Sequence, residues 1–355
     1  MTPRQQETIR LLLLVVLLSA LGGILFSLGH GHGQLRGTLQ GAFTGAVIGL
    51  PLAAFETGLY LRRFAAVLRG ASFPVHLLLK ILFYFVVIVL GLQLGRLVVQ
   101  RPYPGWSGDD VFLSGLLFSF LFSIALNFVF LVRQMLGTAV FRHFLLGTYH
   151  RPREEERIFM FVDVEASTAL AERLGPHQFH AFLNRFFCDL SEPIRATKGL
   201  IHQYAGDGVV ISWRLTGEVR DAACLQCYFA MCEHLAAVRS RYLSEFGAPP
   251  AFRAGLHAGP VVAGEVGDLK TEIVFLGDTV NTAARVLEAC KTLGQRLLVS
   301  GDVLEHVVLP SDLSVRSFGP VALRGKTEPV ELFTVERHIS GERAALSGQG
   351  SPPSS

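Results

Sequence analysis

The sequence predicts two domains of different class: an α-helical membrane domain with four spans over residues 1–132, followed by an α+β domain over residues 157–337. Three observations predict this division. The first 132 residues hold 9 basic and 4 acidic side chains, whereas the rest of the chain holds 23 and 25. Four apolar stretches in the first part are each close to the ~20 residues that cross a bilayer. In the second part, β-rich runs alternate with amphipathic helical patterns.

The composition excludes several classes of protein. Half of the 355 residues are hydrophobic and 17% are charged, against about 25% in a soluble chain, so a single soluble globule and a disordered chain are both excluded. The net charge of +3 is too small and dispersed for nucleic-acid binding. The five cysteines cannot all pair, and Cys224-x-x-Cys227 lies in a helical pattern, which favours buried, reduced thiols over a disulfide scaffold or metal site.

Four apolar stretches predict transmembrane helices. The first follows Arg4 and Arg10; it has no small-x-small cleavage pattern and further spans follow, so we expect an uncleaved helix rather than a signal peptide. Gly41, Gly45 and Gly49 form a small-residue stripe in the second stretch, which allows close helix packing, and dimerisation through it is one interpretation. The expected spans are about residues 11–29, 40–60, 74–98 and 111–132.

Basic residues predict the orientation of these spans. They gather on alternate sides, and the side with more of them is expected to be cytoplasmic. Both termini and the α+β domain are therefore expected in the cytoplasm of a multi-pass protein of the inner (plasma) membrane. The residues on the cytoplasmic side are Arg4, Arg10, Arg62, Arg63, Arg69, Arg133 and Arg142, against Arg36, Arg96 and Arg101 on the other.

Four ionisable residues in or beside the spans leave two interpretations open. Glu56 and Lys80 lie towards the cytoplasmic ends of their spans and form either a functional pair or two side chains that reach the interface; we favour the second. His30 and His32 could bind a metal, but without a third ligand they are more typical of a loop.

The second part begins with a linker, residues 133–156, that we expect to couple the two domains. The run IFMFVDV predicts a buried strand, and Ser167 marks a helix start. The tail, residues 338–355, has a disordered composition. Between them we expect helices at about 176–197, 219–246 and 278–292, and strands at 200–213, 251–265, 296–300 and 313–335.

Two pairs of residues in this part could carry chemistry. Asp163 ends the first strand and Asp207 lies in a predicted hairpin, where most such residues are simply turn formers. Two carboxylates at strand ends could instead hold two divalent cations for phosphoryl chemistry. Asn281 and Arg285 are four residues apart, which places an amide and a guanidinium on one helix face, functional or merely solvated.

Together these residues carry a resemblance. The matching segments occur in the family's order over essentially the whole second part, and they resemble the catalytic domain of class III adenylate and guanylate cyclases, with its ferredoxin-like βαββαβ core. A several-helix anchor before one such domain also resembles bacterial membrane-bound cyclases. The segments are FVDVEAST, YAGD, GLHAGPVVAGEVG, FLGDTVNTAARVLEA and LRGKTEPVELF.

The resemblance implies a role for each residue. Asp163, Asp207 and the carbonyl of Val164 would hold two Mg²⁺ or Mn²⁺ ions, one activating the ribose 3′-hydroxyl of ATP and the other gripping the triphosphate. Asn281 would orient the ribose, and Arg285 would stabilise charge on the α-phosphate. The family takes the two Asp from one protomer and the Asn/Arg pair from its partner, so a homodimer is implied.

Other positions depart from the family. Arg324 stands where the family often has a lysine that contacts the terminal phosphates, with Lys326 as a nearby alternative. Gln203 and Val274 stand at the two purine-reading positions; Gln203 can face either base, whereas the side chain of Val274 makes no hydrogen bond. Ala166 replaces a frequent glycine.

Three functional hypotheses follow from the sequence. The first is a membrane-anchored adenylate cyclase that makes 3′,5′-cyclic AMP and pyrophosphate in signal transduction. The second is a guanylate or mixed-specificity cyclase, because the purine positions are unusual. The third is a membrane receptor whose domain binds nucleotide without turnover; retention of all four catalytic residues argues against it. The ligand or partner of the membrane domain is not identified by the sequence.

Overall fold

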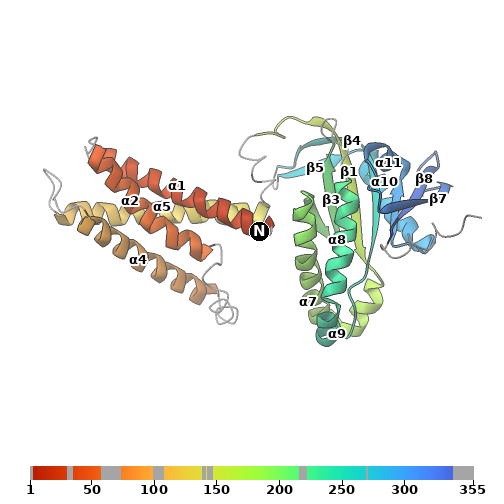
Figure 1. The fold of residues 1–355 in the computed structure, drawn as a ribbon, viewed down its shortest axis with the longest axis horizontal. Helices are drawn as coiled ribbons and strands as arrows, with labels where there is room; N and C mark the ends of the chain where they lie inside the picture. Colours follow the sequence, from red (N-terminus) through yellow and green to blue (C-terminus); the bar gives the residue numbers. More distant parts are fainter. Residues whose placement is uncertain are drawn as a thin grey trace, which may run out of the picture. The chain divides into compact units, whose positions relative to one another are not determined.

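The computed structural model describes residues 3–29, 35–56, 73–98, 108–137, 141, 147–215, 222–268 and 271–338. Two compact units make up the chain, Met1–Phe141 and Arg142–Ser355. The first is helical and the second contains a mixed sheet, so the predicted fold class is confirmed (Figure 1). The predictions for His30 and His32, and for the tail beyond residue 338, lie outside the described residues.

Four helices form the described part of the first unit, and each is long and apolar enough to cross a membrane. The helices extend beyond most of the predicted span ends, because flanking polar residues continue the same backbone hydrogen bonding. Their bounds are Pro3–Gly29 for α1, Leu35–Glu56 for α2, Phe73–Val98 for α4 and Gly108–Leu136 for α5.

The glycine stripe of α2 packs against α1 of the same chain. A Cβ atom on Gly41 would overlap the backbone of Gly23, and one on Gly45 would overlap that of Ser19. Gly49 faces the Ser19 side chain in the same way. The stripe therefore serves close packing of two neighbouring helices, where the sequence had also left dimerisation open.

The sheet of the second unit runs in the order β2-β3-β1-β4-β6-β8-β7, with β5 paired to β4. Neighbouring strands are antiparallel except β4 and β6, which are parallel. The strands are β1 Arg153–Val164, β2 Leu200–Ala205, β3 Gly208–Arg214, β4 Phe252–Val266, β5 Glu272–Leu276, β6 Leu297–Ser300, β7 Leu313–Val321 and β8 Val330–Arg337.

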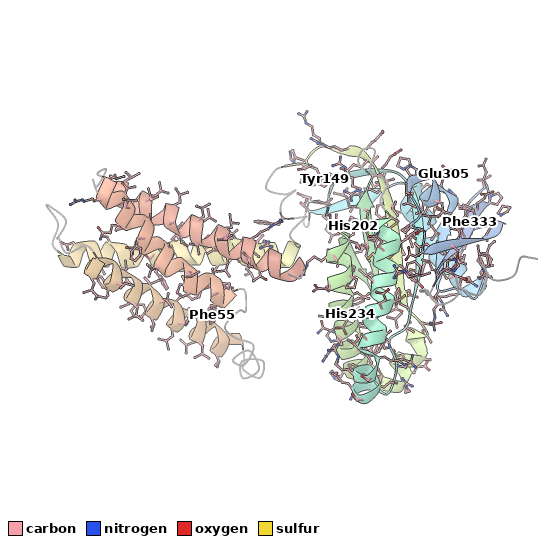
Figure 2. All side chains as sticks on the ribbon, viewed as in Figure 1. Phe55, Tyr149, His202, His234, Glu305 and Phe333 are labelled. Carbon is pink, nitrogen blue, oxygen red and sulfur yellow. The ribbon has the colours of Figure 1, made fainter. Side chains whose placement is uncertain are left out.

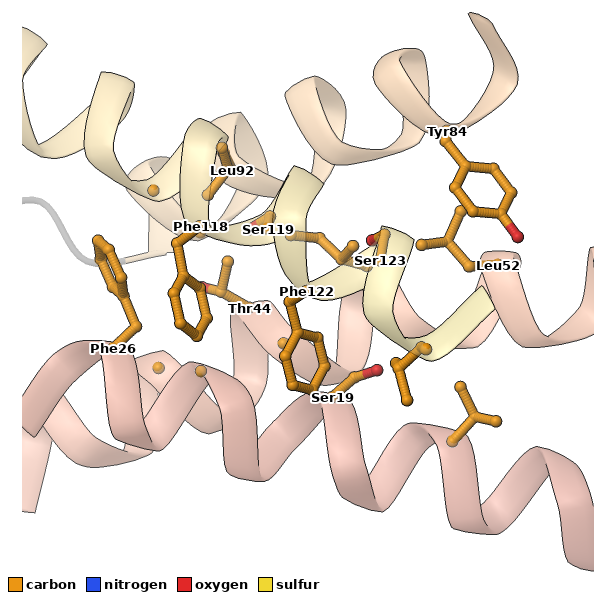
Figure 3. Close-up of a pocket in the computed structure, with 18 of the residues that line it drawn as sticks. Ser19, Phe26, Thr44, Leu52, Tyr84, Leu92, Phe118, Ser119, Phe122 and Ser123 are labelled. Carbon is orange, nitrogen blue, oxygen red and sulfur yellow. The ribbon is translucent and has the colours of Figure 1, made fainter. Parts of the chain in front are cut away.

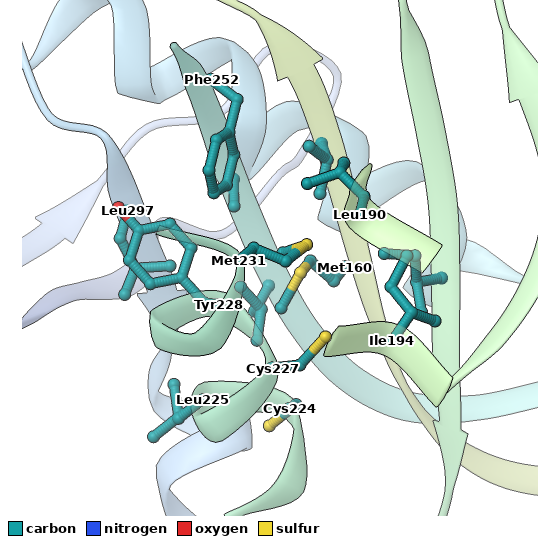
Figure 4. Packing of buried hydrophobic residues seen from close by; sticks show 14 of the residues in the cluster. Met160, Leu190, Ile194, Cys224, Leu225, Cys227, Tyr228, Met231, Phe252 and Leu297 are labelled. Atoms are coloured by element: carbon teal, nitrogen blue, oxygen red, sulfur yellow. The ribbon is translucent and has the colours of Figure 1, made fainter. Parts of the chain in front are cut away.

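Helices cover both faces of this sheet. The main core lies between the sheet and α7 and α8, and it includes Met160, Cys227 and Met231 (Figure 4). A smaller cluster joins β1, β3 and β4 to Ala283 of α10 on the other face. The helices are α7 Ser167–Ala196, α8 Ala223–Ala237, α9 Arg239–Phe246, α10 Asp278–Thr292 and α11 Gly301–His306. Cys224 and Cys227 are buried and form no disulfide, in agreement with the prediction of buried thiols.

The structure differs from the predicted elements in five places. The predicted helix start at Ser167 and the helix expected over 176–197 belong to one helix, α7, which is kinked at Gly175. The single helix expected over 219–246 is two helices that meet at Val238. Strand β5 and helix α11 were not predicted, because both are short. Strand β1 takes in four residues assigned to the linker, since the charged run before IFMFVDV is partly buried in the sheet.

Candidate active site

The alternation of β1 decides where Asp163 lies. Successive side chains of a strand point to opposite faces. Met160 and Val162 belong to the core beneath α7 and α8, whereas Phe159 packs in the cluster with Ala283 of α10. Asp163 therefore shares the α10 face, one residue before β1 ends at Val164.

A tight hairpin brings Asp207 to the same place. It lies between β2 and β3, after Gly206 with a φ of +62°, a left-handed conformation that glycine adopts without strain. Gly208 pairs with Asp163, and a Cβ on Gly208 would lie 2.7 Å from the Val162 carbonyl oxygen. The glycines on both sides of Asp207 are thus required for the close approach of the hairpin to β1.

The carboxylates of Asp163 and Asp207 lie close enough to affect each other's ionisation. Burial and the nearby charge and hydrogen bonding of Asp207 raise the pKa of Asp163 above its ordinary value of 3.8. Lys291, in the last turn of α10, acts against this shift, with its Nζ 3.5 Å from Asp163 Oδ2. Its ammonium is largely exposed, so the charge of the pair is only partly compensated. Lys291 could not be predicted from the sequence, because nothing along the chain links it to Asp163.

These residues fit divalent cations. No cluster of three or more His, Cys, Asp or Glu side chains suited to a metal occurs in the described part of the chain. A pair of carboxylates is nevertheless what Mg²⁺ uses when substrate phosphates and water complete its coordination. The raised pKa of Asp163 indicates negative charge that a cation would neutralise. Asp163, Asp207 and the backbone oxygen of Val164 together make a donor set of hard oxygens.

Asn281 and Arg285 lie on one face of α10, as their spacing predicted. Asn281 is exposed. Arg285 Nη1 donates to both carboxylate oxygens of Glu288, at 2.8 and 2.9 Å. Within the described part of one chain, no contact joins this pair to Asp163 or Asp207. Within the described part of a single chain, the two predicted catalytic pairs are thus not joined by a hydrogen bond or an ion pair.

The two phosphate-contact candidates differ in their surroundings. Arg324 is exposed in the segment between β7 and β8. Lys326 Nζ donates to Asp278 Oδ2 at the start of α10, and this hydrogen bond lowers the pKa of the Asp278 carboxyl. Lys326 is therefore held beside the helix that carries Asn281, whereas no contact within the described residues fixes Arg324.

The two purine positions lie on strands that meet. Gln203 is exposed on β2 beside an irregularity in its pairing with β3, and Val274 is half-buried on β5. Their sequence neighbours, His202 and Phe275, are in ring contact with centroids 4.3 Å apart. The fold therefore brings β2 and β5 together at the level of both predicted base-reading residues.

Sequence analysis also missed a buried polar network at the start of β1. Arg157 Nε donates to Glu155 Oε2 at 2.8 Å, and its Nη1 donates to Ser212 Oγ at 2.9 Å. Tyr149 donates its hydroxyl to Glu155 Oε1 and accepts from Arg157 Nη2. Figure 2 shows Tyr149 and His202 near the same end of the sheet. The only sign of this network in the sequence is the charged run at residues 153–157 before the apolar part of β1, and such a run is also typical of a solvated linker.

His202 and His257 are buried histidines with structural partners. Burial and the charge of Arg157 lower the pKa of His202 to about 3, so its ring is neutral. Its Nε2 lies 2.7 Å from Ser212 Oγ. His257 Nδ1 lies 2.8 Å from Ser300 Oγ, and burial lowers its pKa as well. Their side chains link neighbouring strands, His202 of β2 to β3 and His257 of β4 to β6.

Comparisons with known proteins agree with this arrangement. The family described as "Adenylate and Guanylate cyclase catalytic domain" matches residues 150–337. "Adenylate cyclase 2" of Rhizobium meliloti is 31% identical over 348 residues, which are 97% of this chain and 93% of that protein. "Adenylate cyclase 1" of the same organism is 30% identical over 51% of this chain and 27% of its own length.

A solved structure shares the fold. A bacterial light-regulated adenylyl cyclase superposes with a TM-score of 0.55 at 21% identity, over 68% of this chain and 72% of that one. The mixed sheet, the aspartate at the end of β1 and the glycine-flanked hairpin thus lie in the part of the chain that matches the cyclase family, and one adenylate cyclase is similar to the chain along nearly its whole length. The chain belongs to the class III adenylate and guanylate cyclase family, and it is a nucleotide cyclase.

Proposed function

We propose that this protein is a membrane-anchored adenylate cyclase that converts ATP to 3′,5′-cyclic AMP and pyrophosphate in intracellular signalling. The observation that carries the proposal is the Asp163–Asp207 pair, whose carboxylates repel each other at the edge of the sheet. The similarity to an adenylate cyclase across 97% of the chain supports ATP over GTP as the substrate.

The aspartates would act as ligands. Asp163, Asp207 and the Val164 carbonyl would hold two Mg²⁺ or Mn²⁺ ions; when bound, such ions lower the pKa of the ribose 3′-hydroxyl and neutralise charge on the phosphates. Lys291 lies on the same carboxylate and would have to move aside or share it. Asp163 must be ionised to serve this role, so its raised pKa sets a lower pH limit on activity.

The residues of α10 and the β7–β8 segment would position the nucleotide. Asn281 would hold the ribose, and the guanidinium of Arg285 would leave Glu288 for the α-phosphate, an exchange that is easy because the ion pair is exposed. Lys326 or Arg324 would contact the terminal phosphates. Gln203 and Val274 would face the base, where only Gln203 offers side-chain hydrogen bonds.

A homodimer would complete each site. Asn281 and Arg285 do not contact the aspartate pair within one chain, so a second copy would bring them together. Four large apolar side chains on β2, β4 and β5 are exposed and would suit such an interface. They are Tyr204, Val262, Val266 and Leu276.

The helical unit would anchor the enzyme. Its four described helices have mean hydropathies between 1.4 and 2.7 over their best windows. With the basic flanks described above, the bilayer would be the inner (plasma) membrane, and the catalytic domain would be cytoplasmic. Residues between the two units would then couple events in the membrane to the dimer.

The first experiment supplies membranes carrying the full-length protein with ATP or GTP and Mn²⁺, and measures cyclic AMP and cyclic GMP. Asp163→Asn is the blank, and Glu154→Gln, an exposed carboxylate on the same strand, is the matched control. We expect cyclic AMP from the wild type and the control only. Dominant cyclic GMP would move the assignment to a guanylate cyclase. No product above the blank from a folded protein would leave a nucleotide-binding receptor.

A second experiment tests the shared site. Asp163→Asn and Arg285→Ala are each expected to be inactive alone, whereas their co-expression should restore roughly a quarter of the activity, because half of the dimers would hold one intact site of two. Co-expression of Asp163→Asn with Asp207→Asn should restore none, since both changes fall on the same half of the site. Recovery in that control, or none in the first pair, would contradict the dimer proposal.

A further inference from the structure

The helical unit contains a cavity between its four described helices. Its volume is about 380 Å³, within the range of small-molecule sites. Helix α1 lines it from Val15 to Ser27, a length of about 18 Å at ~1.5 Å per residue. Figure 3 shows Phe26 and Phe118 at one end and Tyr84 at the other, so the cavity is elongated along the helices.

Between its two ends the lining of the cavity is mostly apolar. Ile48, Leu92 and Phe122 line it from three different helices. A ligand that passed between them would bury an apolar body there, and the apolar contact would provide most of its affinity.

One end of the cavity is polar and holds a linked group of side chains. Glu56 Oε1 accepts from the Tyr84 hydroxyl and lies 2.6 Å from Lys80 Nζ. Asn127 Nδ2 donates to the Tyr84 oxygen at 2.8 Å and to the Ser123 carbonyl at 3.1 Å. The charges of Glu56 and Lys80 cancel, and the described residues place no hydrogen bond on Glu56 Oε2. This end therefore offers Glu56 Oε2 as a hydrogen-bond acceptor and carries no net charge.

The opposite end has a polar atom without a partner. Ser27 is 3% exposed, and within the described part of the chain its Oγ has no hydrogen-bond partner. Gln40 lines the same end, because its neighbour Gly41 packs on the Ser27 side chain. An unpaired hydroxyl at a buried site costs free energy, which a ligand atom at this position would recover.

From these observations we infer that the cavity binds an elongated, uncharged molecule that is apolar through its middle and carries a hydrogen-bonding group at each end. A hydroxyl at the Glu56 end would donate to the free carboxylate oxygen. A second polar group would meet Ser27 and Gln40. The cancelled charges of Glu56 and Lys80 disfavour an ionic head group, since neither ion is left for it.

Competitive photolabelling of the full-length protein in lipid vesicles tests this inference. The probe is a long-chain alcohol that bears a diazirine, and the labelled peptides are mapped by mass spectrometry. The competitors are dodecane-1,12-diol, dodecan-1-ol and dodecane, which share one chain and differ only in their polar ends. We expect labelling of α1 and α5, with the diol competing at a concentration about tenfold below that of the alkane.

Variants locate the site. Gly115→Leu would fill the cavity, since a Cβ there makes ordinary contacts with Leu92 and Phe26 and the rest of the side chain enters the space; it should abolish labelling. Leu117→Phe on the outer face of the same helix is the matched control and should not. Gly115→Ala, which adds only the Cβ, checks that the fold tolerates the position.

Two further variants address the ends. Ser27→Ala removes an atom that makes no described hydrogen bond, so it should leave folding intact and lower the advantage of the diol over the mono-alcohol about threefold. Glu56→Leu with Lys80→Leu removes both charges together and should lower the advantage of the mono-alcohol over the alkane. Equal competition by all three compounds, or unchanged labelling of Gly115→Leu, would overturn the inference and leave an apolar crevice filled by lipid chains. None of these readouts depends on cyclase activity.

Discussion

The two ends of strand β1 carry charged side chains on the same face but in opposite circumstances. At its start, Glu155 and Arg157 are buried and of opposite charge, and Arg157 is hydrogen-bonded to Ser212 as well as to Glu155. About 20 Å further along, at ~3.3 Å per residue, Asp163 faces a second carboxylate, with an exposed lysine as its counter-ion.

This difference separates a structural cluster from the proposed metal site. The first cluster satisfies its charges internally, so nothing remains for a ligand to bind. The second leaves negative charge only partly compensated at the end of β1, which disfavours the empty state and favours cation binding. A raised pKa together with a largely exposed counter-ion, rather than charge alone, distinguishes the proposed site on this strand.

The largest expected effect on stability comes from disrupting the buried ion pair of Glu155 and Arg157 at the start of β1. Arg157→Met would leave Glu155 buried without its main partner and should lower the free energy of unfolding by about 3–5 kcal/mol. Fluorescence of Trp213, which lies in the core of the sheet unit, reports this unfolding during a urea titration.

Two variants make this prediction specific. Arg214 also contacts Glu155, at 3.5 Å, but its side chain is 51% exposed, so Arg214→Met should cost less than about 1 kcal/mol. Replacing both buried partners, by Glu155→Leu with Arg157→Met, should recover most of the loss. Equal effects of the two single arginine variants would show that burial does not distinguish the two contacts.

At the other end of β1, removing a charge should not lower the stability of the fold. Asp207→Asn removes the repulsion that raises the pKa of Asp163, so stability at pH 7 should stay level or rise, while cyclase activity falls at least about 100-fold. The measurements are the urea midpoint by Trp213 fluorescence and the rate of cyclic nucleotide formation. A variant that lost stability and activity together would indicate that Asp207 serves the turn rather than the chemistry.

Metal binding should reverse the electrostatic cost at this end. The raised pKa of Asp163 means that the folded chain holds this proton more tightly than the unfolded chain, so the resulting stabilisation exists at acid pH and is lost as the pH rises through the folded pKa. At pH 7 the ionised pair should bind Mn²⁺, and tenfold excess over Kd should stabilise the fold by about 1.4 kcal/mol.

The same experiment at lower pH provides the control. As the pH falls towards the ordinary aspartate value of 3.8, Asp163 takes up its proton and the stabilisation by Mn²⁺ should disappear. The variant Asp163→Asn should show little stabilisation at either pH, and addition of EDTA should remove the effect in the wild type. A pH-independent effect of Mn²⁺ on both proteins would place the metal elsewhere.

The sequence predicted the parts of this molecule that depend on local patterns. Hydropathy located the four apolar helices, a β-rich apolar run located β1, and a glycine-flanked aspartate located the β2–β3 hairpin, so Asp163 and Asp207 could be chosen before the fold was known. Lys291, Tyr149 and the Glu155–Arg157 network could not, because their partners are set by tertiary packing. Glu155 and Arg157 belong to a charged run that is typical of a solvated linker, yet both side chains are buried in the sheet unit.

The smallest effect concerns the turn that leads from β1 into α7. Ala166 has a φ of +54°, a left-handed conformation that costs an alanine roughly 1 kcal/mol, whereas a glycine adopts it freely. Ala166→Gly should therefore stabilise the sheet unit by up to about 1 kcal/mol, less the entropy that a glycine loses on folding. Lys198, with a φ of +58°, gives a second test of the same strain, and Ala181→Gly, at an exposed position in the interior of helix α7, should instead destabilise. Ala166 lies three residues from Asp163, so a stabilised variant with unchanged activity would separate backbone strain from the electrostatic strain at the end of β1. A stabilised variant with altered metal affinity would show that the two are coupled through this turn.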